Sequence, residues 1–363
     1  MFFLRRNPMR IGLIGLQGSG KTTVFNALTK MEAPVAGYAK GRVAPNVAVV
    51  RVMDERVDRL SGLYHPKKTV YATIELADFT GLAEGAARGE TFSTAAMGAI
   101  KTMDALIAVL RNYEEEFPGP PTPLEDLRRI GDELILSDLM VLENRLERIE
   151  ISRKRGQRTE DLVREEKALH RVVEGLNRNE PIRDMALSCE DEKVMRGFQR
   201  LTKKPLMVIL NSDEKSYGKN GALVGEISRT YGVLEFAGKF EMELSGLDDE
   251  EARLFMKDMG IRESAGRRLT TLAHATLGYI SFFTVGSDEV RAWNVREGGT
   301  ALDAASTIHS DLARGFIRAE CFSCADCLRW GSEKGIRENG LFRLEGKDYR
   351  VQDGDILNIR FNV

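Results

Sequence analysis

The sequence predicts an α/β protein, in which a nucleotide-binding domain is interrupted by an antiparallel helical hairpin and followed by a small α+β module. Three observations support this fold class. A glycine-rich phosphate-binding pattern lies near the amino terminus, between a short apolar run and a helical segment. Apolar runs then alternate with helical segments, as in a parallel sheet. Two long stretches in the middle of the chain repeat apolar residues at helical spacing, and a basic turn joins them.

Length and composition limit the classes of protein that fit this sequence. Its 363 residues exceed one ordinary core, which favours two or three domains. A hydrophobic fraction of 42% with 30% charged residues is typical of a globular chain, and the net charge of −2 excludes a polycation. No apolar run approaches the roughly 18 residues that span a membrane. Four cysteines in a chain of this size indicate a reducing compartment, so we expect a cytoplasmic protein.

The phosphate-binding pattern extends from Gly15 to Thr22 and matches G-x-x-x-x-G-K-[ST] at every position. Backbone N–H groups of such a loop close around phosphates, and the following helix presents its positive end to them. We expect Lys21 to reach the β- and γ-phosphates and the Thr22 hydroxyl to bind Mg²⁺. The expected phosphate contacts are the loop residues and the first residues of the helix: Gly15, Gly18, Ser19, Gly20, Lys21, Thr22 and Thr23.

A second phosphate-site motif follows in the order typical of phosphate-loop NTPases. The loop from Pro34 to Pro45 occupies the place of a nucleotide-sensing switch. The strand predicted from Thr69 to Ala77 ends at Asp78, and Gly81 follows three residues later. In such a D-x-x-G motif the carboxylate holds Mg²⁺ through water, while the glycine N–H senses the γ-phosphate. The expected catalytic residues come from both motifs, and Thr22 and Asp78 are also the expected metal ligands: Lys21, Thr22, Asp78 and Gly81.

A helical hairpin is predicted after the next strand, which covers residues 105–110. From Leu124 to Ile151, and again from Leu162 to Leu176, apolar residues recur at helical spacing. Two interpretations of the hairpin stay open here: it is a solvated helical spacer, or it is a contact arm for a protein or RNA. The turn between the two stretches carries four cations, which would make the contact: Arg153, Lys154, Arg155 and Arg158.

The α/β pattern resumes with a strand over 205–210, which ends at Asn211 in an N-S-D-E run. GTPases that read guanine carry N-K-x-D at this place, and the aspartate at the fourth position binds the base. Glu214 holds the fourth position here, which argues against guanine readout. We expect Asn211 and Glu214 to frame the base, with backbone contacts from Ala237 and Gly238. The hairpin is therefore an insertion into a nucleotide-binding domain that continues after it.

The carboxyl-terminal region has strands around an alanine-rich helix and carries a specific set of motifs. By these motifs the chain resembles the YchF/Obg-like ATPases, and the resemblance extends throughout the chain. The matching runs are Phe283-Thr284, Glu289 to Trp293, Ala304-Ala305, Ile308-His309, Gly315 to Ala319, Glu345 to Tyr349, Asp353-Gly354-Asp355 and Phe361-Asn362-Val363.

The resemblance implies a Ras-like/Obg-like phosphate-loop NTPase domain with a coiled-coil insertion and a carboxyl-terminal β-grasp TGS domain. The implied bounds are 9–123 and 204–278 for the nucleotide-binding domain, 124–203 for the insertion and 279–363 for the TGS domain. The family is associated with the ribosome, so ribosomal RNA is an expected partner. The implied cofactors are Mg²⁺ and ATP, which the family favours over GTP because of an N-x-x-E motif that Asn211 and Glu214 match.

Four features bear on hydrolysis. Leu82 stands where Ras-like enzymes place a water-orienting glutamine; the family also has a hydrophobic residue there, which implies slow turnover. The family's Pro-Asn-Val before the Gly-Lys pair is replaced by a Gln-Gly-Ser run, and Gly18 lacks the side chain associated with a potassium site in related enzymes. Arg42 falls at the family's switch threonine. The loop over 112–123 has no histidine, although the family's hydrolysis involves one there.

We therefore expect an ATP-binding switch protein with slow Mg²⁺-dependent ATPase activity, which acts on ribosomes or RNA–protein complexes. The alternative is a non-hydrolysing binding module in which nucleotide only orders the switch loops. Arg42 favours the alternative, whereas the intact set of Lys21, Thr22 and Asp78 opposes it.

Two smaller features are interpreted conservatively. Cys321, Cys324 and Cys327 have the spacing of metal ligands, but no fourth ligand lies nearby in the sequence. Structural thiols are favoured, and an Fe–S or Zn site is the alternative. His309, in the helix predicted from Thr300 to Leu312, is interpreted as a packed or capping residue.

Overall fold

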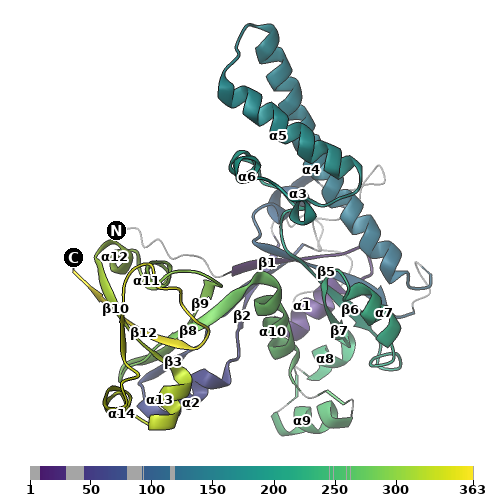
Figure 1. Ribbon diagram of the computed structural model, residues 1–363. Helices are drawn as coiled ribbons and strands as arrows, with labels where there is room; N and C mark the ends of the chain where they lie inside the picture. Colours follow the sequence, from purple (N-terminus) through teal and green to yellow (C-terminus); the bar gives the residue numbers. More distant parts are fainter. Residues whose placement is uncertain are drawn as a thin grey trace. The chain divides into compact units, whose positions relative to one another are not determined.

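The computed structural model describes residues 9–29, 45–79, 92, 94–114, 119–244, 246–247, 249–258, 260–261 and 263–362. The chain divides into two compact units, which are described one at a time (Figure 1). The nucleotide unit comprises residues 10–48 and 76–265, and the carboxyl-terminal unit comprises residues 1–9, 49–75 and 266–363. Among the helices of the described residues, none is both long and apolar enough to cross a membrane.

A six-stranded sheet of order β2-β4-β1-β5-β6-β7 carries the phosphate loop. β5 pairs in parallel with β1 on one side and with β6 on the other, and β6 pairs in parallel with β7. Because parallel strands place their carboxyl ends at one edge, the loops after β1, β5 and β6 meet there. The strands are β1 (Met9–Ile14), β2 (Asn46–Arg51), β4 (Thr73–Asp78), β5 (Ala105–Asn112), β6 (Leu206–Ser212) and β7 (Gly232–Phe236).

Helices complete the α/β fold class that the sequence predicts, and this prediction is confirmed. An apolar core joins β5 and β6 to α3 (Thr94–Ile100), to the first turns of α4 (Pro123–Lys154) and to α7 (Gly221–Ile227). α1 (Lys21–Thr29) follows the phosphate loop and lies beside α8 (Gly238–Leu244). Other helical elements of this unit are η2 (Ile182–Asp184), α6 (Cys189–Met195) and α9 (Asp249–Asp258).

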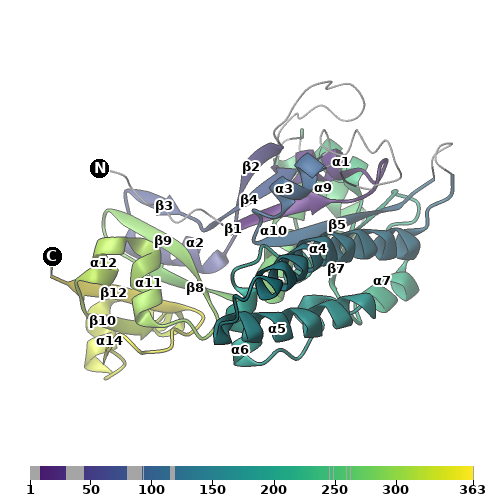
Figure 2. The same ribbon diagram turned by 90° about the horizontal axis from the view of Figure 1, so that it is seen from above.

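The predicted hairpin consists of α4 (Pro123–Lys154) and α5 (Glu160–Asn177), which lie side by side in both views (Figure 2). The helices are antiparallel, because the start of α4 meets the end of α5 and later residues of α4 meet earlier residues of α5. Asn179, just after α5, donates to Asp132 at 3.2 Å, and Arg145 donates to Glu165 at 2.7 Å.

One long helix contributes to two apolar cores. Leu127, Ile130 and Leu134 in the first turns of α4 pack into the core of the nucleotide sheet. Farther along, residues spaced seven apart pack between α4 and α5, as heptad spacing predicts. These residues are Ile135, Leu142 and Ile149 of α4, which face Leu169, Val172 and Leu176 of α5.

A buried carboxylate fastens the segment that returns from the hairpin to the sheet. Asp138 of α4 is 2% exposed and accepts hydrogen bonds from the backbone N–H groups of Leu201 and Thr202, both at 2.8 Å. The Thr202 hydroxyl donates to the same carboxylate at 2.6 Å. Burial is the main influence on Asp138 and raises its pKa, while these hydrogen bonds oppose that shift. The hairpin is thus tied to the segment that precedes β6.

The carboxyl-terminal unit contains a second six-stranded sheet, of order β11-β10-β12-β8-β9-β3. An alanine-rich core packs α11 (Ala301–Ile308) and α12 (Ser310–Arg314) against this sheet. Its other strands and helices are β8 (Tyr279–Thr284), β9 (Glu289–Arg296), β10 (Phe316–Ser323), β11 (Arg343–Glu345), β12 (Asp355–Phe361), α10 (Ala265–Leu277), α13 (Cys324–Trp330) and α14 (Glu333–Glu338). The assignment of this unit to the TGS class stays a prediction.

Residues 49–75 group with the carboxyl-terminal unit, although the sequence places them in the first part of the nucleotide-binding domain. The strand predicted from Thr69 to Ala77 is in fact two strands, because β3 (Lys68–Val70) pairs with β9 and β4 pairs in the first sheet. α2 (Glu55–Tyr64) accompanies β3, and Arg56 of α2 donates to Asp353 at 2.6 Å. The remaining domain bounds stay a prediction.

Candidate nucleotide site

The phosphate loop connects β1 to α1, where the sequence predicts it. Gly18 and Gly20 have φ of 73° and 80°, a left-handed conformation that favours glycine. Lys21 is 6% exposed, and its Nζ donates to the carbonyl oxygens of Gly15 and Leu16, each at 2.8 Å. Burial lowers the pKa of Lys21 to about 8, and the charge of Asp78 partly opposes that shift. The ammonium group therefore lies inside the loop that the phosphates would occupy.

Thr22 and Asp78 come together beside this loop. Thr22 Oγ1 donates to Asp78 Oδ2 at 2.9 Å, and the two residues are 4% and 1% exposed. Hydroxyl and carboxylate oxygens are ligands that Mg²⁺ prefers, and Mg²⁺ usually takes few protein ligands because water and phosphate complete its shell. The oxygen atoms of Thr22 and Asp78 are therefore suitable ligands for Mg²⁺. The neighbouring Ser19 is buried and Thr23 is half-buried.

Asn211 joins the phosphate loop to the predicted base site. Its Nδ2 donates to the Ser19 carbonyl at 3.0 Å, and its Oδ1 accepts from the backbone N–H of Gly238 at 3.1 Å. A Cβ atom at Gly238 would lie 2.5 Å from Asn211 Oδ1, so only glycine allows this approach. Ala237 is 1% exposed beside it. The structure therefore brings the loop, the end of β6 and the start of α8 together.

The two acidic residues of the N-S-D-E run have different surroundings. Asp213 accepts from the Ser216 backbone N–H at 2.8 Å and from its hydroxyl at 2.6 Å, and these bonds lower the pKa of Asp213. Glu214 is exposed and forms neither a hydrogen bond nor an ion pair with the described residues. The carboxylate of Asp213 therefore stabilises a turn, whereas the carboxylate of Glu214 is accessible to a nucleotide base.

Two side chains of the site were not predicted from the sequence. Tyr113, the residue after β5, donates its hydroxyl to the Gly18 carbonyl at 2.7 Å. Glu235 of β7 accepts from the Ser212 hydroxyl at 3.0 Å and from the Gly218 N–H at 3.1 Å, which fixes the loop after β6. Both lie at or near the carboxyl ends of parallel strands, and this position is the signal that could have identified them.

Part of the predicted site lies outside the described residues. This holds for Gly81 of the D-x-x-G motif, for Leu82 beside it and for Arg42. Residues 115–118 of the loop before the hairpin are outside as well. The expectations about these residues stay predictions.

The chain is similar along its length to known nucleotide-binding proteins. The family described as a 50S ribosome-binding GTPase matches residues 10–145, and a carboxyl-terminal YchF family described as a protein of unknown function matches residues 279–362. The ribosome-binding ATPase YchF of Bacillus subtilis is 36% identical over 97% of this chain and 99% of its own length. The chain belongs to the YchF family.

Two further YchF relatives span nearly the whole chain. The Obg-like ATPase 1 of Oryza sativa is 35% identical and covers 98% of this chain and 92% of its own. The solved structure of the Schizosaccharomyces pombe YchF GTPase superposes with a TM-score of 0.84 at 28% identity, over 98% of both chains. The predicted family resemblance is therefore confirmed, and the fold is that of a YchF protein.

The four cations predicted at the hairpin tip are all exposed in this YchF chain, but two of them are paired. Arg153 forms an ion pair with Glu166 at 3.3 Å, and Lys154 pairs with Glu150 at 2.8 Å. Within the described part of the chain, Arg155 and Arg158 form no ion pair. The accessible positive charge therefore concentrates on these last two residues.

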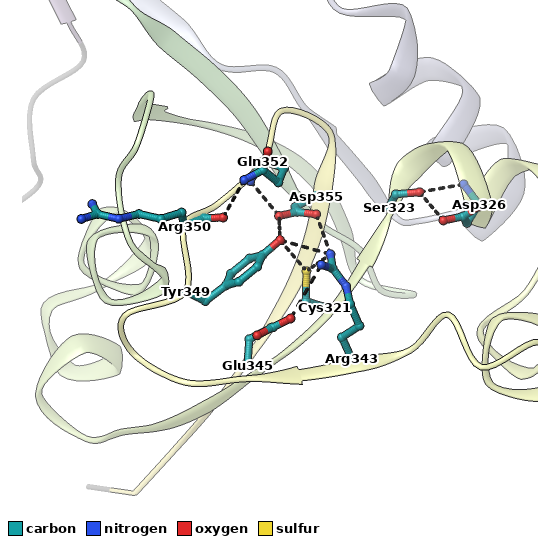
Figure 3. A network of polar contacts seen from close by, with 9 residues as sticks. All are labelled: Cys321, Ser323, Asp326, Arg343, Glu345, Tyr349, Arg350, Gln352 and Asp355. Carbon is teal, nitrogen blue, oxygen red and sulfur yellow. Dashed lines mark hydrogen bonds and ion pairs between the residues drawn. The ribbon is translucent and has the colours of Figure 1, made fainter.

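Residues of the carboxyl-terminal motifs take part in a polar network around the buried side chains of Asp355 and Cys321 (Figure 3). Asp355 is 2% exposed and accepts from the Tyr349 hydroxyl at 2.8 Å and from Arg343 at 3.2 Å. Arg343 also donates to Cys321 Sγ at 3.2 Å. Burial, the main cause, raises the pKa of the Cys321 thiol to about 12. These contacts give the motif residues Tyr349 and Asp355 a structural role.

The structure places the three carboxyl-terminal cysteines in buried positions and His309 at the start of a helix. Cys321, Cys324 and Cys327 are free and buried, and Cys327 Sγ lies 3.4 Å from the Tyr64 hydroxyl. Among the described residues, no group of three or more His, Cys, Asp or Glu is arranged to hold a metal ion. His309 Nδ1 accepts from the Asp311 N–H at 3.2 Å and so caps α12.

Proposed function

We propose that this chain is an ATP-binding switch protein that binds ribosomes and hydrolyses ATP slowly with Mg²⁺. The observation that carries the proposal is the convergence of Lys21, Thr22 and Asp78 at one phosphate loop. Relatives across the whole chain are named ribosome-binding ATPases, which supports both the hydrolase activity and the ribosomal partner. A ribosome-binding function also supports the expected cytoplasmic location.

Each residue of the site has a proposed role. Lys21 neutralises phosphate charge, and the backbone N–H groups of the loop surround the phosphates. Thr22 and Asp78 would hold Mg²⁺, which supplies charge neutralisation when bound. Gly81 senses the γ-phosphate. The phosphate contacts are completed by the rest of the predicted set: Gly15, Gly18, Ser19, Gly20 and Thr23.

The base site supports ATP rather than GTP as the preferred nucleotide. The carboxylate of Asp213 is held by Ser216, so it does not serve as the guanine reader. Asn211 and Glu214 frame the base, and the backbone of Ala237 and Gly238 borders it. GTP remains a second, weaker nucleotide in this proposal.

Hydrolysis is proposed to be slow because Leu82 offers no group to orient the attacking water. The test is single-turnover hydrolysis of ATP with and without ribosomes, with a Lys21→Ala variant as the background. We expect turnover well below about 1 s⁻¹ that exceeds this background. Hydrolysis equal to the background in both conditions would show instead that the chain is a non-hydrolysing, nucleotide-gated binding module.

The hairpin tip is the proposed electrostatic contact with ribosomal RNA. The contact consists of the four tip cations Arg153, Lys154, Arg155 and Arg158. The main contacts are Arg155 and Arg158, because within the described residues these two form no ion pair, whereas the other two do. Binding of phosphates by such cations releases counterions and is therefore salt-sensitive.

A matched pair of double variants tests the tip. Arg155→Ser with Arg158→Ser removes the two tip charges, whereas Arg164→Ser with Arg178→Ser removes two charges paired with glutamates elsewhere on the hairpin. We expect only the tip variant to weaken ribosome co-sedimentation. In that variant the slope of the logarithm of the binding constant against the logarithm of the salt concentration should be smaller in magnitude by roughly 1.5. Equal binding by both variants at every salt concentration would make the tip a solvated turn.

A further inference from the structure

Tyr113 makes a contact with the phosphate loop that no sequence motif assigns. Its hydroxyl donates to the Gly18 carbonyl at 2.7 Å, across 95 positions of the chain. Tyr113 follows directly after β5, which lies between β1 and β6 in the sheet. The contact therefore joins the middle of the phosphate loop to the central strand of the nucleotide unit.

Three side chains donate hydrogen bonds to carbonyl groups of the phosphate loop. Lys21 binds the carbonyls of Gly15 and Leu16, and Asn211 binds the carbonyl of Ser19. Tyr113 binds the carbonyl of Gly18, which lies between these two attachments. Carbonyls that are bound by side chains point away from an anion site, so loop N–H groups can face it; the Ser19 N–H instead donates to the Leu16 carbonyl at 3.3 Å. Lys21 and Asn211 belong to the nucleotide motifs, whereas Tyr113 does not.

The loop needs such an attachment at Gly18. Glycine loses more conformational freedom on ordering than any other residue, and Gly18 has no side chain with which to fix itself. Its φ of 73° is a conformation that other residues adopt only with strain. A hydrogen bond to its carbonyl therefore selects one of many conformations that an unattached glycine would sample.

Tyr113 is itself anchored by rigid neighbours. Arg111 is 5% exposed, and its Nη2 donates to the Pro120 carbonyl at 3.1 Å. Asn112 Nδ2 donates to the Ser212 hydroxyl at 2.9 Å. Backbone pairing of Arg111 with Asn211 and of Asn112 with Ser212 continues to the end of β5. The hydroxyl of Tyr113 thus extends from a hydrogen-bonded strand end to the glycine-rich loop.

We propose that Tyr113 is a positioning residue that pre-organises the phosphate loop for di- and triphosphates by holding the carbonyl of Gly18. The inference deepens the proposed nucleotide-binding function and rests on it. The Tyr113 hydroxyl thereby orders a loop that its glycines leave conformationally free. Pre-organisation lowers the entropy that binding must otherwise remove, so the effect appears in affinity.

The first arm of the test measures the loop without nucleotide. Tyr113→Phe keeps the ring and removes the hydroxyl, and Tyr71→Phe is the matched control, because its hydroxyl contacts Asp58 in the carboxyl-terminal unit. Hydrogen exchange is followed by mass spectrometry in the full chain. We expect faster exchange in peptides over residues 15–22 of Tyr113→Phe only, with unchanged exchange in β6 as the measure of intact folding.

The second arm measures nucleotide affinity by calorimetry with Mg²⁺. We expect Tyr113→Phe to bind ATP and ADP about three- to tenfold more weakly, the range of one net hydrogen bond. The Tyr71→Phe control should bind both nucleotides like the parent. The loss of affinity is expected because the phosphate loop of Tyr113→Phe is less ordered before nucleotide binds. Faster exchange and weaker binding should therefore occur together in this variant.

Three results separate the possible failures. If Tyr113→Phe matches the parent in both loop exchange and affinity, Tyr113 has no positioning role. If β6 exchanges faster to the same extent as the loop, the hydroxyl supports the whole unit and the proposal is also overturned. A parent chain that binds no nucleotide would refute the proposed function, while the exchange arm would still decide whether Tyr113 orders the loop.

Discussion

Thr22 Oγ1 donates a hydrogen bond to Asp78 Oδ2 across 2.9 Å, although 56 positions separate the two residues in the chain. Thr22 lies in the first turn of α1, and Asp78 ends β4. Both side chains are almost fully buried, at 4% and 1% exposure. The hydroxyl and the carboxylate are therefore held in contact by two separate elements, which is the arrangement that a shared Mg²⁺ requires.

The first prediction concerns this pair. Thr22→Val removes the hydroxyl and keeps the shape, so it should weaken ATP binding about tenfold or more in Mg²⁺ and much less in EDTA. Calorimetric titration in the two buffers measures both values. Thr29→Val is the matched control, because the Thr29 hydroxyl, among the described residues, bonds only to the Phe25 carbonyl at the other end of α1. An equal loss with and without Mg²⁺ would contradict the assignment of Thr22 as a metal ligand.

A second prediction concerns the pH dependence of nucleotide binding. Burial lowers the pKa of Lys21 to about 8, and phosphate charges beside the ammonium would raise it again. Affinity for ATP should therefore be maximal below pH 8, where Lys21 is protonated in the free protein. Above pH 8 it should fall by up to about tenfold per pH unit, because Lys21 must then take up a proton when ATP binds. Titrations from pH 7 to 9.5 measure this slope. The Lys21→Gln variant should bind weakly with no such slope, and a flat profile in the parent would refute the prediction.

Base choice is the subject of a third prediction. Because Ser216 holds Asp213 and Glu214 occupies the fourth position, ATP should bind at least as tightly as GTP. Competition titrations give the ratio directly. A preference for GTP above about tenfold, or 1.4 kcal/mol, would overturn the proposed base site.

The fourth prediction concerns the attachment of the hairpin. Asp138→Ala leaves the buried N–H groups of Leu201 and Thr202 without their acceptor, so it should lower the free energy of unfolding by about 1–3 kcal/mol. Urea unfolding followed by circular dichroism measures the change. Asp132→Ala is the matched control on the same helix. Within the described part of the chain it removes only the exposed hydrogen bond from Asn179, so it should change stability by less than about 1 kcal/mol. Equal urea midpoints for the two variants would show that the Asp138 contacts add little.

Local sequence patterns determined the main features of the nucleotide unit. The run from Gly15 to Thr22 specified the phosphate loop, because its glycines and its lysine have few other uses at that spacing. Heptad spacing specified the hairpin, since α4 and α5 meet through residues seven apart. Both signals depend on neighbours along one segment, and such signals are readable without the fold.

Only the tertiary structure decided which distant side chains meet. The stretch from Thr69 to Ala77 reads as one strand, yet β3 and β4 pair in different sheets because each finds a different partner strand. Tyr113 has no motif, and its role arises because β5 ends beside the phosphate loop. The sequence likewise shows four equal cations at the hairpin tip, whereas the helix register pairs Arg153 and Lys154 with glutamates and leaves Arg155 and Arg158 accessible. Pairing of this kind depends on strand order and helix register, which packing of the whole unit sets and which no local pattern encodes.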